Sequence, residues 1–371
     1  HPDGWPGVPH NPSREQVKAA LRTLWEPFEH FPFVDAISRS INLAACLTAV
    51  QRPMLDTAPA FAINSFKAGS GKGKAAKAIG WLSGNEPTES PWSTEPEEQR
   101  KRLMAKLMTA PPSLLIDNVN GSLESDTLCA VLTSTKYEDR RLGASENITV
   151  PTRVLVTATG NNIQVTGDLA RRVLVATIDH GVESPERLAF PFDPVARVRE
   201  RWLYYRAAAL TILRGFMAAG KPQNGKGCMG SFEEWDALIR QCVLWVQAEG
   251  LAPFELADPA DAVSANHTND PDTMKLRALM AGWRGVIGER PVKARELVEA
   301  SYPVSAFSPE SESRANLADA LNEIAGERGT INPRRLGRWI ERHAGRVVDG
   351  VRINKDGISG GYARWRVDAA Q

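Results

Sequence analysis

The sequence has little cysteine, little histidine and no long apolar run. Its four cysteines, Cys46, Cys129, Cys228 and Cys242, stand far apart and form no CxxC pair. Together with six equally scattered histidines, this spacing disfavours a zinc site and favours buried free thiols in a reducing cytoplasm. No apolar run approaches the roughly 18 residues of a membrane-spanning helix, and the opening HPDGWPGVPHNPS has no signal-peptide pattern.

A charge excess of one sign is also missing. Lys and Arg number 45 against 44 Asp and Glu, a net charge of +1. This balance excludes a uniformly basic nucleic-acid coat but leaves local basic patches open. Hydrophobic residues make up 42% of the 371, which supports packed cores and two or three domains. Because the chain does not begin with Met, we expect a piece cut from a longer protein.

Apolar runs alternate with helical stretches through the first half of the chain. Four continuous apolar runs are expected as strands: 60–64, 113–117, 154–158 and 173–178. Helical patterns over 95–109 and 123–133 lie between them. This alternation predicts an α/β fold with a parallel sheet covered on both faces. Before it, a helix is expected from Ser13, with Gln16 at the capping-box position.

Composition divides the chain into five segments. We expect a helical N-terminal segment (1–50), an α/β core (51–185), a helical lid or bundle (186–250), a Pro- and Asp-rich linker (251–273) and a C-terminal unit (274–371). In the last unit, several helical patterns precede a helix that Asn332 caps and Pro333 begins, followed by a Gly-rich hairpin. Helices followed by a terminal hairpin are the order of a winged helix.

The strongest motif is a glycine-rich loop between the first expected strand and a helix. Its residues are Ala68, Gly69, Ser70, Gly71, Lys72, Gly73 and Lys74. This context is typical of a P-loop, in which backbone N–H groups and the lysine hold the phosphates of ATP. Two positions depart from the usual motif, since Phe66 replaces the first glycine and Gly73 replaces the Ser or Thr that ligates Mg²⁺. The alternative is a glycine-rich turn that binds no nucleotide.

A second motif is an apolar strand that ends in a carboxylate, LLIDN, about 45 residues after Lys72. This pattern is typical of Walker B, and Asp117 is expected to hold Mg²⁺ directly or through water. Asn118 stands where many related ATPases carry a catalytic Glu, and an amide can orient water but is no general base. The alternative is an ordinary buried strand that ends at a turn.

Residues from about 30 to 250 resemble the AAA+ ATPase module of phage and mobile-element primase-helicases, close to the superfamily 3 helicases. The stretches that carry the resemblance include AFAINSFKAGSGKGKAAKAIG, LLIDNV and VLVTATGNNIQVTGDLARRVLVATID. The resemblance implies an AAA+ P-loop sheet, ATP and Mg²⁺ as cofactors, a homo-oligomeric ring, expected as a hexamer, and DNA helicase activity in the cytoplasm of a bacterial host cell. The primase or polymerase part that precedes this module in the family is absent from the sequence.

The resemblance also assigns roles in catalysis. Asn161 follows the third apolar run and corresponds to the residue that senses the γ-phosphate or positions water. Arg172, with Arg171, corresponds to an arginine finger that reaches the γ-phosphate in the neighbouring subunit. The alternative for the two arginines is surface charge at the end of a helix.

Two basic segments are expected to contact DNA. By resemblance, the segment between Walker B and Asn161 carries a pore hairpin that would bind single-stranded DNA, with basic residues Lys136, Arg140, Arg141 and Arg153. The alternative is a solvated hairpin in which Glu138 and Asp139 pair the arginines.

The C-terminal unit carries the second basic segment. Arg335, Arg338 and Arg342 share one helix face, opposite the apolar face of Leu336, Trp339, Ile340 and His343, and Arg352, Lys355 and Arg364 flank the hairpin. A basic helix beside a basic wing predicts duplex DNA binding. A protein-docking winged helix is the alternative. Trp365 is expected in the core.

Three functions remain open from the sequence. The first is an ATP-driven DNA helicase. The second is a nucleotide-controlled DNA-binding loader or initiator without unwinding activity, which Gly73 and Asn118 favour. The third is a small-molecule P-loop kinase, which the C-terminal unit disfavours.

Overall fold

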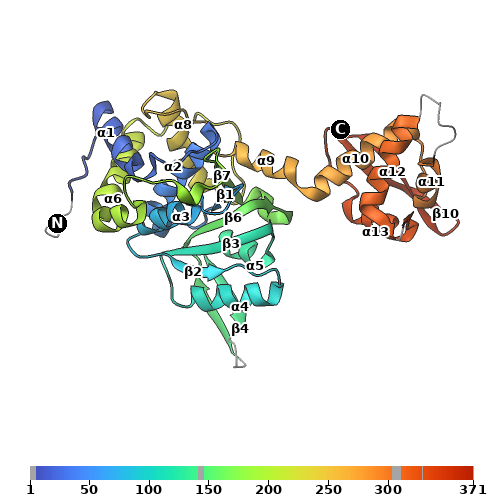
Figure 1. Cartoon of the computed structure of the whole chain (residues 1–371), viewed down its shortest axis with the longest axis horizontal. Coiled ribbons are helices and arrows are strands. Elements are labelled where there is room, and N and C mark those ends of the chain that lie inside the picture. Colours follow the sequence, from blue (N-terminus) through green and yellow to red (C-terminus); the bar gives the residue numbers. More distant parts are fainter. Residues whose placement is uncertain (1–5, 141–145, 303–310, 328, 371) are drawn as a thin grey trace. The chain divides into compact units, whose positions relative to one another are not determined.

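The computed structural model describes residues 6–140, 146–302, 311–327 and 329–370. It contains two compact units, one ending at His267 and the other beginning at Thr268 (Figure 1). In the described part of the chain, no helix is long and apolar enough to cross a membrane.

The first unit is built on a five-stranded parallel sheet. Its strands lie in the order β2 (Thr88–Pro91), β3 (Ser113–Leu123), β6 (Leu155–Val165), β1 (Ala60–Ser65) and β7 (Val173–Ile178). Four of these strands contain the predicted apolar runs, so the α/β fold class is confirmed. Strand β2, at one edge, was not predicted.

Helices lie on both sides of this sheet (Figure 1). They are α1 (Arg14–Trp25), α2 (Ala36–Gln51), α3 (Lys72–Trp81), α4 (Pro96–Leu107), α5 (Asp126–Leu132), α6 (Pro194–Ala218), α7 (Glu233–Trp235) and α8 (Gln241–Ala248). Ser13 and Gln16 form the predicted capping box at the start of α1.

One hydrophobic core joins the helices and the sheet. Side chains of α1, α6 and α8, such as Leu21, Phe216 and Val246, belong to the same buried cluster as Phe61 of β1. The N-terminal helical segment and the expected lid therefore pack as parts of the first unit.

The segment expected as a linker differs from that expectation. Leu251 and Leu256 are buried in the core of the first unit, and residues from Asp261 to Asn269 form helix α9. The buried side chain of Asn266 donates hydrogen bonds of 3.0 and 2.8 Å to the carbonyl oxygens of Ala170 and Val173. These contacts fasten α9 to the first unit, which the Pro- and Asp-rich composition of 251–273 did not indicate.

The second unit has its own core. It contains α10 (Pro271–Val286), α11 (Ala294–Ala300), α12 (Ser311–Ala325), α13 (Pro333–His343) and the strands β8 (Gly326–Glu327), β9 (Thr330–Ile331), β10 (Val351–Ser359) and β11 (Tyr362–Ala369). Trp283, Leu336 and Trp365 are buried in this core. As predicted, the Asn332 side chain caps α13, accepting hydrogen bonds from two backbone N–H groups, and Pro333 begins the helix. An isolated antiparallel bridge between Val292 and Trp365 joins the segment before α11 to strand β11 of the terminal hairpin.

Candidate nucleotide and DNA sites

The glycine-rich loop joins β1 to α3 as predicted. Gly69 and Gly71 have φ angles of +73° and +85°, a region that other residues rarely adopt, and Gly71 is the N-cap of α3. No side chain caps this helix start, so its first backbone N–H groups remain as donors toward an anion. The hydroxyl of Ser70 is buried without a hydrogen-bond partner in the described structure.

Three polar side chains meet beside this loop: one begins α3, and the other two come from the interior of β3 and β6, near the level at which β1 ends. Lys72 Nζ donates a 2.8 Å hydrogen bond to Asn161 Oδ1 of β6. Asp117 of β3 lies close enough for its charge to act on the lysine: burial lowers the pKa of Lys72, and the carboxylate opposes that shift. Because β3, β6 and β1 are adjacent in the sheet, these three predicted residues lie close together at the end of the sheet that faces the loop.

Thr159 belongs to the same group, although no motif in the sequence singles it out. Its hydroxyl donates to Asp117 Oδ1, and it also accepts a 3.4 Å hydrogen bond from the backbone N–H of Asn118. Thr159 lies two residues before Asn161 in β6, and side chains two apart in a strand share a face. That spacing could have identified it.

Of the described side chains that meet beside the loop, the Asp117 carboxylate has the chemistry of a Mg²⁺ ligand. Mg²⁺ is commonly bound by one or two carboxylates plus water and substrate phosphates, so Asp117 fits a nucleotide-bound Mg²⁺. Gly73 supplies no hydroxyl, but a Cβ built on it meets no atom within 4 Å. A larger residue therefore has room there. Asn118 has a φ of +59° and an exposed side chain, at an irregularity where β3 shifts register against β6.

The other lysines of the loop are engaged elsewhere. Lys67 Nζ donates to the carbonyl oxygen of Val182 at 2.9 Å, and Lys74 Nζ pairs with Asp193 at 3.0 Å. Asp193 caps the start of α6. Lys74, which was expected among the nucleotide-binding residues, directs its ammonium to this cap.

The two arginines lie at the opposite end of the sheet from the loop. They stand at the end of the short 3₁₀ helix Gly167–Arg171, and the carbonyl of Arg172 accepts a hydrogen bond from the backbone N–H of Ala60 at the start of β1. The loop follows the other end of β1, roughly 17 Å away at about 3.3 Å per residue. Neither arginine can reach a nucleotide at its own loop.

The two neighbouring arginines differ in burial. The side chain of Arg172 is only 8% exposed, ion-paired with Asp168 and hydrogen-bonded to its carbonyl at 2.7 Å. The side chain of Arg171 is 42% exposed and also contacts the Asp168 carboxylate. An arginine finger must extend from the surface of its own subunit into the neighbouring one. The exposed side chain of Arg171 fits this requirement better than the buried side chain of Arg172.

The expected pore segment forms a hairpin of β4 (Lys136–Arg140) and β5 (Asn147–Pro151), which extends from the first unit (Figure 1). Lys136 and Arg140 are exposed, whereas Arg141 lies outside the described residues. Arg153 is ion-paired with Asp56.

The acidic residues of the hairpin do not pair its basic side chains within the described structure. Asp139 pairs with Arg100 of α4, and Glu138 accepts from Asn147 at 2.8 Å. The backbone N–H of Arg140 donates a 2.7 Å hydrogen bond to the Asp139 carboxylate, so Asp139 contacts both Arg100 and the main chain of the hairpin.

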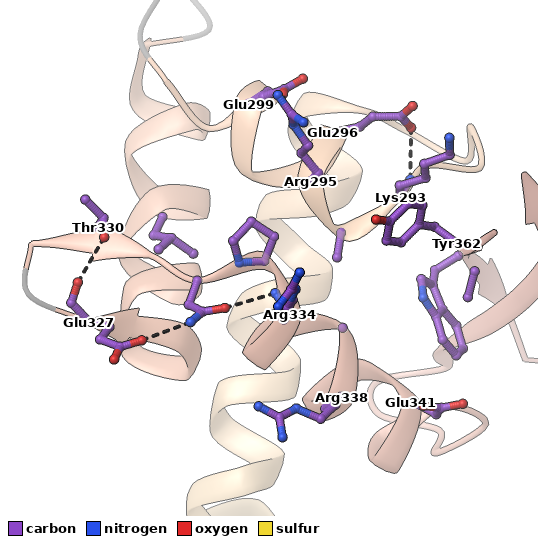
Figure 2. Close-up of a pocket in the computed structure, with 17 residues that line it drawn as sticks. Lys293, Arg295, Glu296, Glu299, Glu327, Thr330, Arg334, Arg338, Glu341 and Tyr362 are labelled. Carbon is purple, nitrogen blue, oxygen red and sulfur yellow. Dashed lines mark hydrogen bonds and ion pairs between the residues drawn. The ribbon is translucent and has the colours of Figure 1, made fainter. Parts of the chain in front are cut away.

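In the second unit, α13 borders an open groove of about 1350 Å³. Figure 2 shows Arg334 and Arg338 beside this groove, together with Glu341 of the same helix and Glu296 and Glu299 of α11. Glu299 is already paired with Arg295 at 2.8 Å. Of the remaining predicted DNA contacts, Arg335, Arg342 and Lys355 are exposed, whereas Arg352 and Arg364 are half-buried.

Comparisons with known proteins give a distant likeness in structure. No family model matches the chain, and no curated protein matches it. Two solved forms of the apo NrS-1 C-terminal region share 14% and 13% identity, each with a TM-score of 0.43, covering 97% of this chain and 76% and 75% of theirs. The JCV helicase shares 12% identity with a TM-score of 0.28, over 70% of this chain and 73% of that one. Such values carry no statement about activity, which has to come from the residues of the site.

Proposed function

We propose that this chain is the ATPase part of a ring-forming DNA helicase of the phage or mobile-element type. The observation that carries the proposal is the meeting of Lys72, Asn161 and Asp117 beside an uncapped helix start. Phosphoryl transfer to water requires a phosphate-binding loop, a cation, a carboxylate and an amide. All four lie together at the end of the sheet that faces the loop.

Each group has a role in this proposal. The backbone N–H groups at Gly71 and Lys72 bind the β- and γ-phosphates, and the unpartnered Ser70 hydroxyl adds a donor. Lys72 supplies a positive charge, and Asn161 orients either the γ-phosphate or the attacking water. Mg²⁺, held by Asp117, would neutralise negative charge that develops on the phosphate oxygens.

Hydrolysis across a subunit interface follows from the position of Arg171. Because this residue lies at the far end of β1 from its own loop, its guanidinium can complete only the site of another copy. A chain that offers a loop at one end and a finger at the other assembles head to tail, and such an interface gives a ring when its rotation closes. We propose a hexamer.

DNA contacts complete the proposal. Lys136 and Arg140 of the β4–β5 hairpin contact one strand in the ring, with Arg141 and Arg153 as further candidates. The second unit, a proposed winged helix, binds duplex through Arg335, Arg338 and Arg342 of α13, with Arg352, Lys355 and Arg364 on the hairpin. A primase or polymerase part would precede this module in the whole protein, in the cytoplasm of a bacterial host.

The second candidate is a DNA loader whose nucleotide state controls assembly. Asn118 favours it, because an exposed amide beside Asp117 cannot act as a general base. Measuring ATP turnover with and without single-stranded DNA, alongside displacement of a strand from a forked duplex, separates the two. The helicase predicts stimulated turnover and ATP-dependent displacement, both lost in Lys72→Ala. Duplex binding that responds to ATP without displacement would favour the loader.

A further inference from the structure

The terminal hairpin of the second unit carries two large apolar side chains at its tip. Its strands β10 and β11 are joined by Gly360 and Gly361, whose φ angles of +59° and +78° suit a two-residue hairpin turn. Ile358, two residues before this turn, is 70% exposed, and Tyr362, directly after it, is 66% exposed. Both side chains therefore lie in solvent, beyond the residues of the hairpin that pack in the core.

These two side chains lie on opposite faces of the hairpin. Ile358 pairs with Ala363 across the strands, and Ser359 pairs with Tyr362. Cross-strand partners share a face, and successive residues of a strand point to opposite faces, so Ile358 and Tyr362 are on different faces. A two-stranded ribbon with an apolar group on each face of its tip can enter as a wedge between two flat surfaces.

The charges around the tip favour an anionic partner. Both carboxylates of the hairpin, Asp356 and Asp368, are paired with Arg366, at 3.7 and 3.0 Å. The ammonium of Lys293 lies beside the turn, 3.6 Å from the place that a Cβ on the first turn glycine would take. Lys355 is exposed on β10. In the part of the chain that the structure describes, neither lysine forms an ion pair, so both can contact phosphates.

The tip borders the same groove as helix α13. Figure 2 shows Tyr362 and Lys293 at one end of this groove. Arg334 and Arg338 of α13 line it farther along. Arg338 also belongs to the basic face that is proposed to bind duplex, so DNA on that face reaches the groove that the tip borders.

We propose that the tip of this hairpin binds the junction where duplex DNA opens into single strands, with the Tyr362 ring and the Ile358 side chain stacked on the bases exposed there. The inference rests on the proposed function, because it requires the second unit to bind DNA. Inside a duplex every base is stacked on both faces, and a side chain that enters must first unstack them. At a junction the last base pair already has an open face, so the wedge binds there at a lower cost.

A DNA junction satisfies both kinds of group at the tip. Aromatic rings stack on the face of any base, so this contact tolerates changes of sequence. Phosphates next to the stacked bases would pair Lys293 and Lys355. An apolar protein surface would cover the two apolar side chains but leave these ammonium groups without a counter-charge.

Binding titrations of the full chain with two DNAs test this inference: a forked duplex, and a fully paired duplex of the same strand length. The wild type should bind the fork at least about fivefold more tightly. Tyr362→Ala should weaken fork binding by about 5- to 100-fold, the range that base stacking supports, and leave the paired duplex unchanged. The salt dependence of fork binding should keep its slope, because no phosphate contact is lost.

Three further variants sharpen the test. Tyr362→Phe keeps the ring and should bind the fork like the wild type. Ile358→Ser tests the opposite face of the tip and should also weaken fork binding. Tyr302→Ala is the matched control, because this tyrosine of the second unit is 56% exposed but does not line the groove, and it should have no effect. The side chains at 358 and 362 lie largely in solvent, so all these variants should fold.

The outcomes distinguish the tip from the function. Equal weakening for both DNAs, no weakening in Tyr362→Ala or Ile358→Ser, or the same loss in Tyr362→Phe as in Tyr362→Ala would overturn the inference while leaving duplex binding and the ATPase proposal intact. If the wild type bound neither DNA, the proposed role of the second unit would fall, and the inference with it.

Discussion

At the scale of single residues, Lys72 links the two halves of the proposed chemistry. Its ammonium bonds Asn161, lies near Asp117 and stands at the start of the helix that would bind phosphate. Burial lowers its pKa, so a bound triphosphate would compensate a charge that the protein itself leaves partly unmatched. Phosphate binding therefore explains why the Lys72 ammonium lies at this position, and no structural role in the core is needed to explain it.

Gly73 gives the first prediction. A Cβ at this position meets nothing within 4 Å, so Gly73→Ser should fold normally. Its hydroxyl would stand where P-loops usually ligate Mg²⁺. Half-maximal turnover should therefore need less Mg²⁺ than in the wild type, with an equal or faster maximal rate. Titration of Mg²⁺ against ATP turnover measures this. A folded Gly73→Ser protein that no longer binds ATP would show that the loop needs glycine for close approach of the nucleotide.

The two neighbouring arginines should differ when each is replaced by alanine. Arg171→Ala should retain ATP binding and stability yet lose turnover, and mixing it with Lys72→Ala should restore part of the activity through mixed interfaces. Arg172→Ala should instead lose about 1–3 kcal/mol of unfolding free energy, because it removes buried hydrogen bonds. Turnover of single and mixed variants, with chemical denaturation of each, separates the roles. Full turnover by Arg171→Ala at every protein concentration would contradict the trans assignment.

At the scale of elements, the pairing of β3 and β6 positions Asp117 against Asn161. The two strands shift register between Ile116 and Val119, and Gly160 is the partner of Val119 directly after the shift. A Cβ built on Gly160 would overlap the carbonyl oxygen of Val119, a clash that no small adjustment relieves. The sheet therefore requires glycine here because of backbone proximity.

The prediction is that Gly160→Ala loses more than about 2 kcal/mol of unfolding free energy and also impairs turnover, since the register that aligns the site must change. Denaturant unfolding checks the first effect. Gly73→Ala, where the added methyl meets open space within helix α3, is the matched control and should be at least as stable as the wild type. Equal stability of Gly160→Ala and the wild type would contradict the described pairing.

Elements with a strong local pattern could be predicted from the sequence, and those without one could not. The four apolar runs gave four strands, and Asn332 with Pro333 gave the start of α13. Strand β2 was missed because TESP has no apolar run, and α9 was missed because its polar residues are held by Asn266 through tertiary contacts.

The candidate site divides in the same way. Lys72, Asp117 and Asn161 each follow a recognisable strand, so their convergence could be predicted. By contrast, a cavity beside the glycine-rich loop is lined by Phe31 and Phe192, which lie 161 residues apart in the sequence. No local pattern indicates that these two residues line the same cavity. Which of the two arginines is buried likewise depends on tertiary packing, at the end of the sheet where β1 starts.

At the scale of the whole molecule, two separate cores predict two units that fold independently. A chain ending at His267 keeps all but the last two residues of α9 together with the Asn266 contacts, and should fold and hydrolyse ATP. It should bind duplex DNA more weakly and with a shallower salt dependence, the slope falling by about 0.9 for each DNA phosphate that the protein no longer neutralises. Binding titrations across salt concentrations measure this. Equal affinity with the same slope would make the second unit a protein-docking module.

The central claim is that the edge formed by Lys72, Asp117 and Asn161 hydrolyses ATP. Steady-state ATP turnover of Lys72→Ala, with single-stranded DNA present, tests it most directly. Lys67→Ala is the control, because this lysine belongs to the same loop but bonds the carbonyl of Val182. We predict that Lys72→Ala is folded and without measurable turnover, while Lys67→Ala retains most of the wild-type rate. Wild-type turnover by a pure, folded Lys72→Ala protein would contradict the assignment of this edge as the catalytic site.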